Sequence, residues 1–349
     1  MNKLNFMNIR KHKIPVCCLL ATLLMVAAAC AKQESAPLNE AAKRAFDAWL
    51  SVNHPTAKPT GLGIYILDDR PGTGTTVGDN DTYLFVSYTT RDLKGTITGT
   101  NEKQIAQQLG TYSEANYYGS KALLNDRSGT PTGLLEAIKG MRVGGTRTAI
   151  VPGWLNVIAD YRTADEYLRN KSGDAAVYTI TLDDKTSDIT QWEIDTLRRY
   201  VAGHLAGVDS TRYGYYYRQL KAPSDTTTLP RDTSIYINYT GRLLNGQVFD
   251  TTVGDTAKMY SLYSPKKKYA PVKIKLNQTY TEITMGADEN ATGNTLVEGF
   301  SYCLSRMKRY EKGVCAFYSM RGYSYSGSGN TIPPYAPIVF EIELVDKPK

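Results

Sequence analysis

Residues 81–89 read DTYLFVSYT, and residues 232–240 read DTSIYINYT. In both segments apolar and polar side chains alternate, which is typical of a β-strand with one buried face. The two segments align without a gap, and the agreement continues at three further pairs of positions: Arg91 with Arg242, Leu93 with Leu244, and Gly95 with Gly246. Farther along, residues 133–141 align with residues 299–307. The chain therefore carries two copies of one α+β domain.

An amphipathic helix is expected before each copy. Residues 38–53 have their apolar side chains at helical spacing. Residues 188–207 repeat this design, with Asp188 and Gln191 as a capping box and Gly207 as the C-cap. The two apolar stripes comprise Leu38, Ala42, Ala45, Phe46, Trp49 and Leu50, and then Ile189, Trp192, Leu197, Tyr200, Val201 and Leu205. We expect both stripes to pack on a neighbouring domain, with a partner-binding face as the alternative.

Composition argues against two classes of function. The chain has 349 residues and a formal charge of +7, which falls to +3 without the four cations that lie before residue 30. A charge this small gives little support for a nucleic-acid partner. The histidines are His12, His54 and His204, none of them at metal-ligand spacing, and no Cys-x-x-Cys occurs. We therefore expect no metal and no cofactor.

The N-terminus has the layout of a secretory signal. Residues 1–13 are basic, residues 14–29 are apolar but too few to span a bilayer comfortably, and small residues precede Cys30. The sequence VAAAC at 26–30 resembles the lipobox of bacterial lipoproteins, although Ala27 stands where leucine is preferred. The resemblance implies acylation of Cys30 and anchoring to the outer membrane, on its periplasmic or surface face, because no aspartate follows the cysteine. An ordinary cleaved signal is the alternative.

Five motifs in the second copy follow one another in a set order. They are Tyr239-Thr240-Gly241, the sequence NGQVFD at 245–250, LVEGF at 296–300, Tyr323, and IPPYAPIVFEIEL at 332–344. Each motif alone is weakly specific. Together, and in this order, they resemble the FKBP family of peptidyl-prolyl isomerases.

The resemblance implies a bent antiparallel sheet wrapped around a short helix, with an apolar pocket above the helix. Asp250 and Tyr323 would be the catalytic residues, and Tyr323 and the Val297 backbone N–H would hold the carbonyls of the substrate. The substrate-binding residues would be Tyr239, Phe249, Val272, Leu296, Val297, Phe300, Ile332 and Phe340. This sequence departs from the family at Phe300, Val272 and Ser324, where tryptophan, phenylalanine and glycine are usual, and by an insertion near 277–294.

The first copy has lost these motifs. Thr98 and Gly99 occupy the Phe-Asp positions, and Thr130 and Pro131 stand where the second copy has Leu296 and Val297. Residues 172–174, with the sequence SGD, replace Ile-Pro-Pro. We expect the same fold without the catalytic residues.

The expected organisation has five parts. These are a signal peptide at 1–29, a tether and helix at 30–60, a degenerate FKBP-like domain at 61–186, a connecting helix at 187–213 and an isomerase domain at 214–349. Export makes a disulfide between Cys303 and Cys315 possible, with two buried thiols as the alternative.

The resemblance predicts a prolyl isomerase that assists the folding of exported proteins. Its partners would be proline-containing segments of unfolded exported chains and, through the lipid anchor, the membrane. A non-catalytic peptide- or partner-binding lipoprotein is the first alternative. A surface carbohydrate or nutrient binder is the second, which the 26 tyrosines permit but do not favour. Client identity and oligomeric state stay open.

Overall fold

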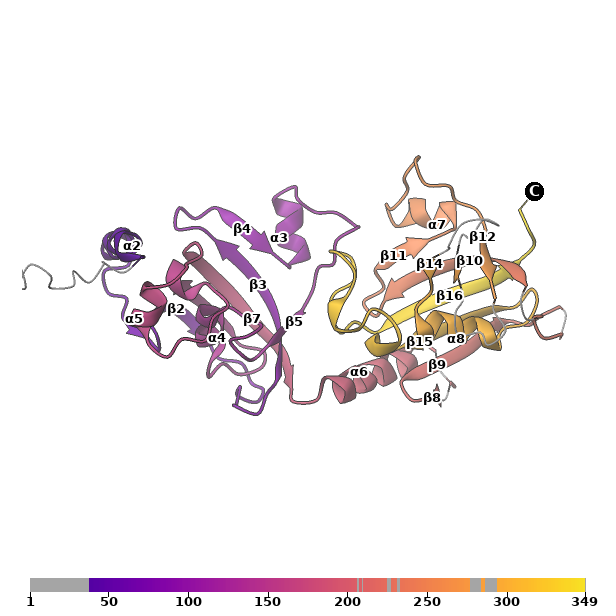
Figure 1. The fold of residues 1–349 in the computed structure, drawn as a ribbon, viewed down its shortest axis with the longest axis horizontal. Coiled ribbons are helices and arrows are strands. Elements are labelled where there is room, and N and C mark those ends of the chain that lie inside the picture. Colours follow the sequence, from indigo (N-terminus) through magenta and orange to yellow (C-terminus); the bar gives the residue numbers. More distant parts are fainter. Residues whose placement is uncertain are drawn as a thin grey trace, which may run out of the picture.

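The computed structural model describes residues 38–205, 207–208, 210–224, 227–230, 233–276, 284–285 and 294–348. It has two domains arranged end to end, with helix α6 (Ile189–His204) between them (Figure 1). Cys30, the predicted signal and most of the predicted insertion lie outside the described residues. Within those residues, no helix is both long enough and apolar enough to cross a membrane.

The first domain is a mixed structure of one antiparallel sheet and short helices. Its strands are β1 (Pro59–Thr60), β2 (Ile64–Arg70), β3 (Tyr83–Arg91), β4 (Ile97–Thr100), β5 (Lys121–Leu124), β6 (Thr146–Val151) and β7 (Ala176–Thr186). Its helices are α2 (Glu40–Asn53), α3 (Lys103–Gln108), α4 (Thr132–Ile138), α5 (Ala164–Leu168) and the 3-10 turn η1 (Gly153–Leu155).

The second domain has the same kind of architecture. Its strands are β8 (Ser210–Arg212), β9 (Tyr215–Lys221), β10 (Ser234–Leu243), β11 (Val248–Thr251), β12 (Val272–Lys275), β13 (Thr284–Met285), β14 (Asn294–Thr295), β15 (Lys312–Phe317) and β16 (Ile338–Val345). Its helices are α7 (Gly254–Met259), α8 (Glu298–Arg306) and the 3-10 turns η2 (Ser319–Arg321) and η3 (Ser324–Ser326).

The strand order shows that one domain repeats the other. The first sheet has the order β1-β2-β6-β7-β3-β4, with β5 also paired to β3. The second has the order β8-β9-β15-β16-β10-β12-β13-β14, with β11 also paired to β10. The registers agree as well, because Thr90 pairs with Gly99 and Gly241 pairs with Asp250. The predicted α+β fold with two copies is therefore confirmed.

Each sheet packs over one short helix. In the first domain, Leu134, Ala137 and Ile138 of α4 join one core cluster with residues of β6 and β7. In the second domain, Phe300 and Leu304 of α8 join the corresponding cluster with residues of β15 and β16. In each helix these side chains lie on one face, and the packing of this face on the sheet fixes the position of the helix.

The sequence left open whether Cys303 and Cys315 form a disulfide or are two separate thiols. Both are buried free thiols, one on α8 and the other on β15. Burial raises the pKa of the Cys303 thiol well above its usual value, so the group stays protonated and packs as a small apolar residue. The structure therefore has the two buried thiols and no bridge between them.

The helices that precede the copies pack as predicted, with three corrections. Phe46 and Leu50 of α2 are buried in the first domain, but of the other residues of the predicted stripe Ala42 and Ala45 are exposed, and Leu38 is 70% exposed and lies before the helix begins. Asp188 accepts a hydrogen bond from the Gln191 N–H at 2.9 Å, which is one half of the predicted capping box, whereas its own N–H donates to the Thr186 hydroxyl at 3.1 Å. The C-cap is not Gly207, because α6 ends at His204 and Leu205 caps it.

Helix α6 joins the two domains through side chains on different faces. Leu197 and Val201 pack in one cluster with Tyr216 of β9 and Val339 of β16. Trp192, one turn nearer the first domain, stacks on Phe85 of β3 with ring centroids 3.9 Å apart. The second domain thus covers Leu197 and Val201 of the apolar stripe, and the first domain covers Trp192 at its N-terminal end.

Glu193 adds a buried polar contact to this helix. Its side chain is 1% exposed, and its carboxylate accepts hydrogen bonds from the Ser319 N–H at 2.6 Å and the Ser319 hydroxyl at 2.7 Å. Burial raises the pKa of the carboxyl to about 7, and the two hydrogen bonds only partly oppose this effect.

The Glu193→Gln variant should therefore change how stability depends on pH. Because the pKa of Glu193 is higher in the folded than in the unfolded protein, the group stabilises the fold fully at pH values below its ordinary pKa of 4.5. This contribution is lost as the pH rises to about 7. Between pH 4 and pH 8, the free energy of unfolding of the variant should rise relative to wild type by up to about 3 kcal/mol, at about 1.36 kcal/mol per pKa unit. Denaturant titrations at a series of pH values measure this. The exposed Asp79→Asn variant is the control, and parallel pH profiles for Glu193→Gln and wild type would contradict the expectation.

Candidate active site in the second domain

A cavity of about 400 Å³ opens above α8 in the second domain. Strands β10, β11 and β16, the start of α8 and the segments near 285, 295 and 323–332 provide its walls. The lining residues are Tyr239, Phe249, Asp250, Met285, Thr295, Leu296, Val297, Phe300, Tyr323, Ser328, Thr331, Ile332 and Phe340.

Aromatic rings form the base of the cavity. Phe300 is 1% exposed and meets Phe340 edge to face, with ring centroids 4.8 Å apart and an interplanar angle of 81°. Tyr239 packs edge-on against Phe300 at 5.7 Å. Gly241 allows this arrangement, since a Cβ atom there would lie 2.5 Å from the ring of Phe249. The result is a rigid apolar floor that a smaller side chain at any of these positions would open.

Asp250 is the charged group of the cavity. Its Oδ2 accepts a hydrogen bond from the Tyr239 hydroxyl at 2.5 Å, and its Oδ1 forms an ion pair with Lys267. Burial and then the neighbouring Asp250 raise the pKa of Tyr239, so the tyrosine remains a protonated donor. The carboxylate is thereby held in one orientation at the edge of the aromatic floor.

Two further polar groups face the cavity without internal partners. The Tyr323 hydroxyl has no hydrogen-bond partner among the residues that the structure describes. Burial, and after it the charge of Asp250, raises the pKa of this hydroxyl, which keeps its proton available for donation. Val297 is the N-cap of α8, and in the same part of the chain its backbone N–H donates to no internal acceptor. Both groups can therefore donate to a carbonyl of a bound peptide.

The sequence-predicted residues gather at this cavity, with one exception. Nine of the ten lie in its wall, and the tenth, Val272, does not. Val272 pairs with Ile237 at the start of β12, and its side chain packs against the core beside the cavity. Its position is set by the register of β12, which the motifs do not determine.

Several wall residues were not foreseen. Met285, Thr295, Ser328 and Thr331 complete the lining, and Met285 comes from the inserted segment. Lys267 was missed as well, although the run Lys266-Lys267-Lys268 near a predicted catalytic carboxylate was a usable signal. Ser324 has a φ of 54°, a conformation that glycine adopts more readily, and this explains why glycine is usual there.

The corresponding place in the first domain differs in its chemistry. Gly99 lies where Asp250 lies in the second domain, because both face the equivalent residue of the neighbouring strand. Pro131 is the N-cap of α4, as Val297 is of α8, and proline has no backbone N–H to donate. The first domain thus lacks both the carboxylate and one of the two donors.

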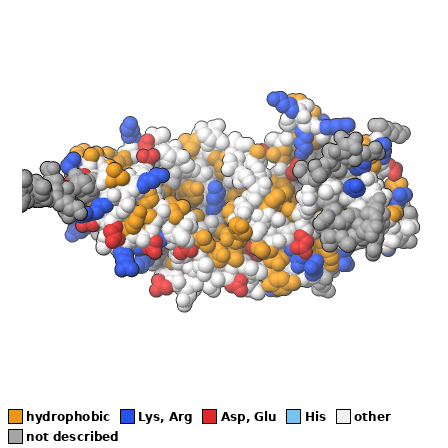
Figure 2. Space-filling model, in the orientation of Figure 1, with side chains coloured by type: hydrophobic (Ala, Val, Ile, Leu, Met, Phe, Trp, Pro, Cys, Tyr) orange, Lys and Arg blue, Asp and Glu red, His pale blue; other side chains and the backbone are white. Residues whose placement is uncertain are grey.

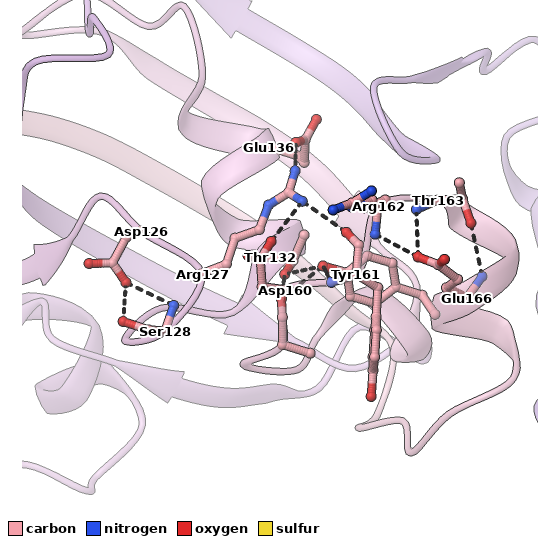
Figure 3. A network of polar contacts seen from close by, with 12 residues as sticks. Asp126, Arg127, Ser128, Thr132, Glu136, Asp160, Tyr161, Arg162, Thr163 and Glu166 are labelled. Atoms are coloured by element: carbon pink, nitrogen blue, oxygen red, sulfur yellow. Dashed lines mark hydrogen bonds and ion pairs between the residues drawn. The ribbon is translucent and has the colours of Figure 1, made fainter.

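Polar contacts instead tie the start of α4 to its surroundings (Figure 3). Arg127 donates to the Tyr161 carbonyl at 3.0 Å and forms an ion pair with Glu136 at 3.4 Å. The Thr132 hydroxyl lies 2.7 Å from the Ala159 carbonyl oxygen, to which it donates. This network replaces the open, ligand-accessible helix start of the second domain.

The cavity of the second domain therefore combines an aromatic floor, one fixed carboxylate and two groups that can donate hydrogen bonds. Residues 226–345 match the family model described as FKBP-type peptidyl-prolyl cis-trans isomerase. The second domain is thus similar to that family over most of its length, which confirms the resemblance that the motifs predicted.

Individual proteins show the same relationship. A probable FKBP-type peptidyl-prolyl cis-trans isomerase of Haemophilus influenzae is 26% identical over 139 residues, which are 40% of this chain and 45% of the relative. The FKBP-type 22 kDa peptidyl-prolyl cis-trans isomerase of Escherichia coli is 25% identical over 142 residues, 40% of this chain and 53% of the relative. This chain therefore spans about half the length of these two relatives.

Solved structures are similar at lower identity. FkpA from Escherichia coli is 19% identical, with 45% of this chain and 60% of that chain covered and a TM-score of 0.31. The three FKBP domains of wheat FKBP73 are 16% identical, with 81% of this chain and 94% of that chain covered and a TM-score of 0.28.

Proposed function

We propose that the second domain catalyses the cis-trans isomerisation of prolyl peptide bonds. The observation that carries this proposal is the aromatic cavity that Asp250, Tyr323 and Val297 line together. These groups suit a reaction that breaks no covalent bond. They also occupy the positions at which the family motifs occur.

Prolyl isomerisation can be accelerated by moving the amide bond from water into an apolar site. Rotation about a peptide bond costs about 18–20 kcal/mol, because resonance is lost when the bond twists. The two isomers of an X-Pro bond are close in energy, yet they exchange in tens to hundreds of seconds. A twisted amide has less charge separation than a planar one, so an apolar site favours it. Each 1.36 kcal/mol removed from the barrier raises the rate about tenfold.

The wall residues have distinct parts in this proposal. Phe249, Phe300 and Phe340 surround the proline ring, while Tyr323 and the Val297 N–H hold carbonyls of the substrate. Asp250, fixed by Tyr239 and Lys267, polarises the region next to the twisting carbonyl. Fixed groups are useful here because they need no reorganisation as the bond rotates.

A protease-coupled assay with a prolyl tetrapeptide tests the proposal on the chain without its predicted signal. Faster appearance of the trans isomer than in buffer is the expected result. If proline peptides bind in the cavity while their isomerisation stays at the uncatalysed rate, the domain is a binding module, which is the first alternative.

The first domain should be catalytically silent. Without a carboxylate at Gly99 and without an N–H at Pro131, it lacks the group proposed to polarise the substrate and one of the two donors proposed to hold it. Expressed alone as residues 38–186, which keeps α2 and its buried Phe46 and Leu50, and with circular dichroism to verify folding, it should leave the uncatalysed rate unchanged. Turnover equal to that of the second domain would show that the two missing groups are dispensable.

We further infer that the protein acts outside the cytoplasm, on exported clients, from a lipid anchor at Cys30. The support is the signal-like N-terminus and the small residues before the cysteine. A Cys30→Ala variant should lose acyl labelling and leave the membrane fraction, because the acyl chains provide the buried methylene groups. Cys17→Ala, within the signal, is the matched control. Continued membrane retention of a processed Cys30→Ala protein would rule out this anchor.

A further inference from the structure

A second cavity, of about 310 Å³, lies where the two domains meet. Strands β3, β5 and β7 contribute to it from the first domain, α6 from the junction, and the segments 243–245 and 333–337 from the second domain. Figure 2 shows hydrophobic side chains gathered in the middle of this face of the molecule, between the two domains. The cavity is separate from the active site, whose wall residues differ from its own.

Its walls are mainly aromatic and proline side chains. Phe85 and Trp192 stack at an interplanar angle of 19°, and Tyr335, whose ring meets Tyr83 at 5.1 Å, closes another side. Pro333, Pro334 and Pro337 complete the apolar surface. A pocket of this size and lining can bury one large apolar side chain.

Two adjacent carboxylates border the same apolar surface. Strand β7 has a bulge here, because Phe85 pairs with Asp184 and Val86 pairs with Leu182. Asp183 is therefore the extra residue, and a bulge redirects a side chain that would otherwise point to the opposite face. As a result, both Asp183 and Asp184 line the cavity.

Neither carboxylate is neutralised by a basic side chain. Asp184 accepts from the Trp192 indole N–H at 2.8 Å, and Asp183 accepts from the Ser87 hydroxyl at 2.7 Å. Neither forms an ion pair in the part of the chain that the structure describes. The nearby Lys185 is already paired with Asp81 at 2.7 Å.

One buried polar atom at the wall also lacks a partner. The Ser120 hydroxyl is inaccessible to solvent and has no hydrogen-bond partner in the described structure. Buried polar groups are nearly always satisfied, so this hydroxyl is available to a water molecule or a ligand group that reaches the wall. The cavity thus combines an apolar surface, negative charge and an open hydrogen-bonding position.

The segment 328–337 connects this cavity to the active site. Ser328, Thr331 and Ile332 line the active site, and residues 333–337 line the cavity at the domain junction. Backbone contacts from the first domain hold this segment, since the Tyr117 N–H donates to the Asn330 carbonyl at 2.7 Å. One continuous segment therefore contributes wall residues to both cavities.

We propose that the cavity at the domain junction is a second peptide site, which takes a large apolar side chain of an unfolded polypeptide next to a lysine or arginine. The apolar side chain enters between Trp192 and Tyr335, and the cation lies against Asp183 and Asp184. The charge complementarity selects basic over acidic neighbours. The site needs no proline in its ligand and does not depend on isomerase activity.

Calorimetric titration of the full chain with a proline-free peptide tests this. The probe is acetyl-Ala-Phe-Arg-Leu-Ala-amide, and its matched control has glutamate in place of arginine. The probe should bind and the control should bind at least about tenfold more weakly. An Asp183→Asn, Asp184→Asn double variant, which keeps the hydrogen-bond acceptors, should lose the preference for arginine. Thr196→Phe, which fills the cavity from α6, should abolish binding.

An Asp250→Leu, Tyr323→Phe variant separates this site from the active site, since it should bind the probe as wild type does. Loss of binding in that variant would place the probe in the active site and overturn the proposal. Equal affinity for the two peptides, or no measurable binding of either, would overturn it as well.

Discussion

The Asp250→Leu, Tyr323→Phe double variant should isomerise a prolyl peptide on the order of a hundredfold more slowly than wild type. Removing the Tyr323 hydroxyl deletes one hydrogen bond to substrate, which is worth about 0.5–1.5 kcal/mol, or up to about tenfold in rate. Removing Asp250 costs more, since hydrogen bonds to charged groups are worth about 1.5–3 kcal/mol. It also leaves Tyr239 and Lys267 without their common partner.

Asp250→Leu removes the charge while roughly preserving bulk. Asp255→Leu, on exposed α7 of the same domain, removes an equal charge away from the cavity and should leave the rate unchanged. Single and double variants measured in one protease-coupled assay, with melting curves for each, separate catalysis from folding. A folded double variant that is as fast as wild type would show that these residues do not form the active site.

Phe340→Ala should destabilise the second domain by about 3–5 kcal/mol. The side chain is 4% exposed, and its ring contacts those of Tyr239, Phe249, Phe300 and Phe317. Truncation therefore leaves a void in the floor of the active site that rigid neighbours cannot fill. Denaturant unfolding followed by circular dichroism measures the loss.

Tyr325→Ala is the matched control for this truncation, because Tyr325 is an exposed aromatic residue of the same domain. Surface substitutions usually change stability by less than about 0.5 kcal/mol. A similar loss in both variants would mean that Phe340 does not support the core as its ring contacts indicate. Because Phe340→Ala weakens the fold, its isomerase rate is interpretable only where the variant is shown to be folded.

Strand patterns and motif order predicted most of the fold. Alternation in residues 81–89 and 232–240 located β3 and β10, and the gapless alignment predicted the duplication that the two strand orders confirm. Such patterns work because a half-buried strand needs a period of two. They also placed Asp250 and Tyr323, since the motifs that contain these residues lie directly on or beside strands and turns of the second sheet.

The remaining features depend on tertiary geometry. Lys267 reaches Asp250 through a loop whose path no periodicity describes, and Val272 is directed by the register of β12. The bulge at Asp183 is visible only in the pairing of β3 with β7. Contacts between domains, such as Trp192 on Phe85, are long-range as well, so a single sequence gives no direct signal for them.

The pairing pattern has a consequence for the order in which the chain folds. All strands of the first sheet are complete at Thr186, whereas β9 in the second sheet pairs with β15, about a hundred residues later. In a polypeptide that emerges N-terminus first, the first domain can close before β9 exists, because domains generally fold as units. Loop closure over such a separation is slow, and the side of β9 that does not pair with β8 remains an open edge meanwhile. The completed first domain then offers Phe85 as a docking surface for Trp192, which orients α6 for the sheet that assembles next.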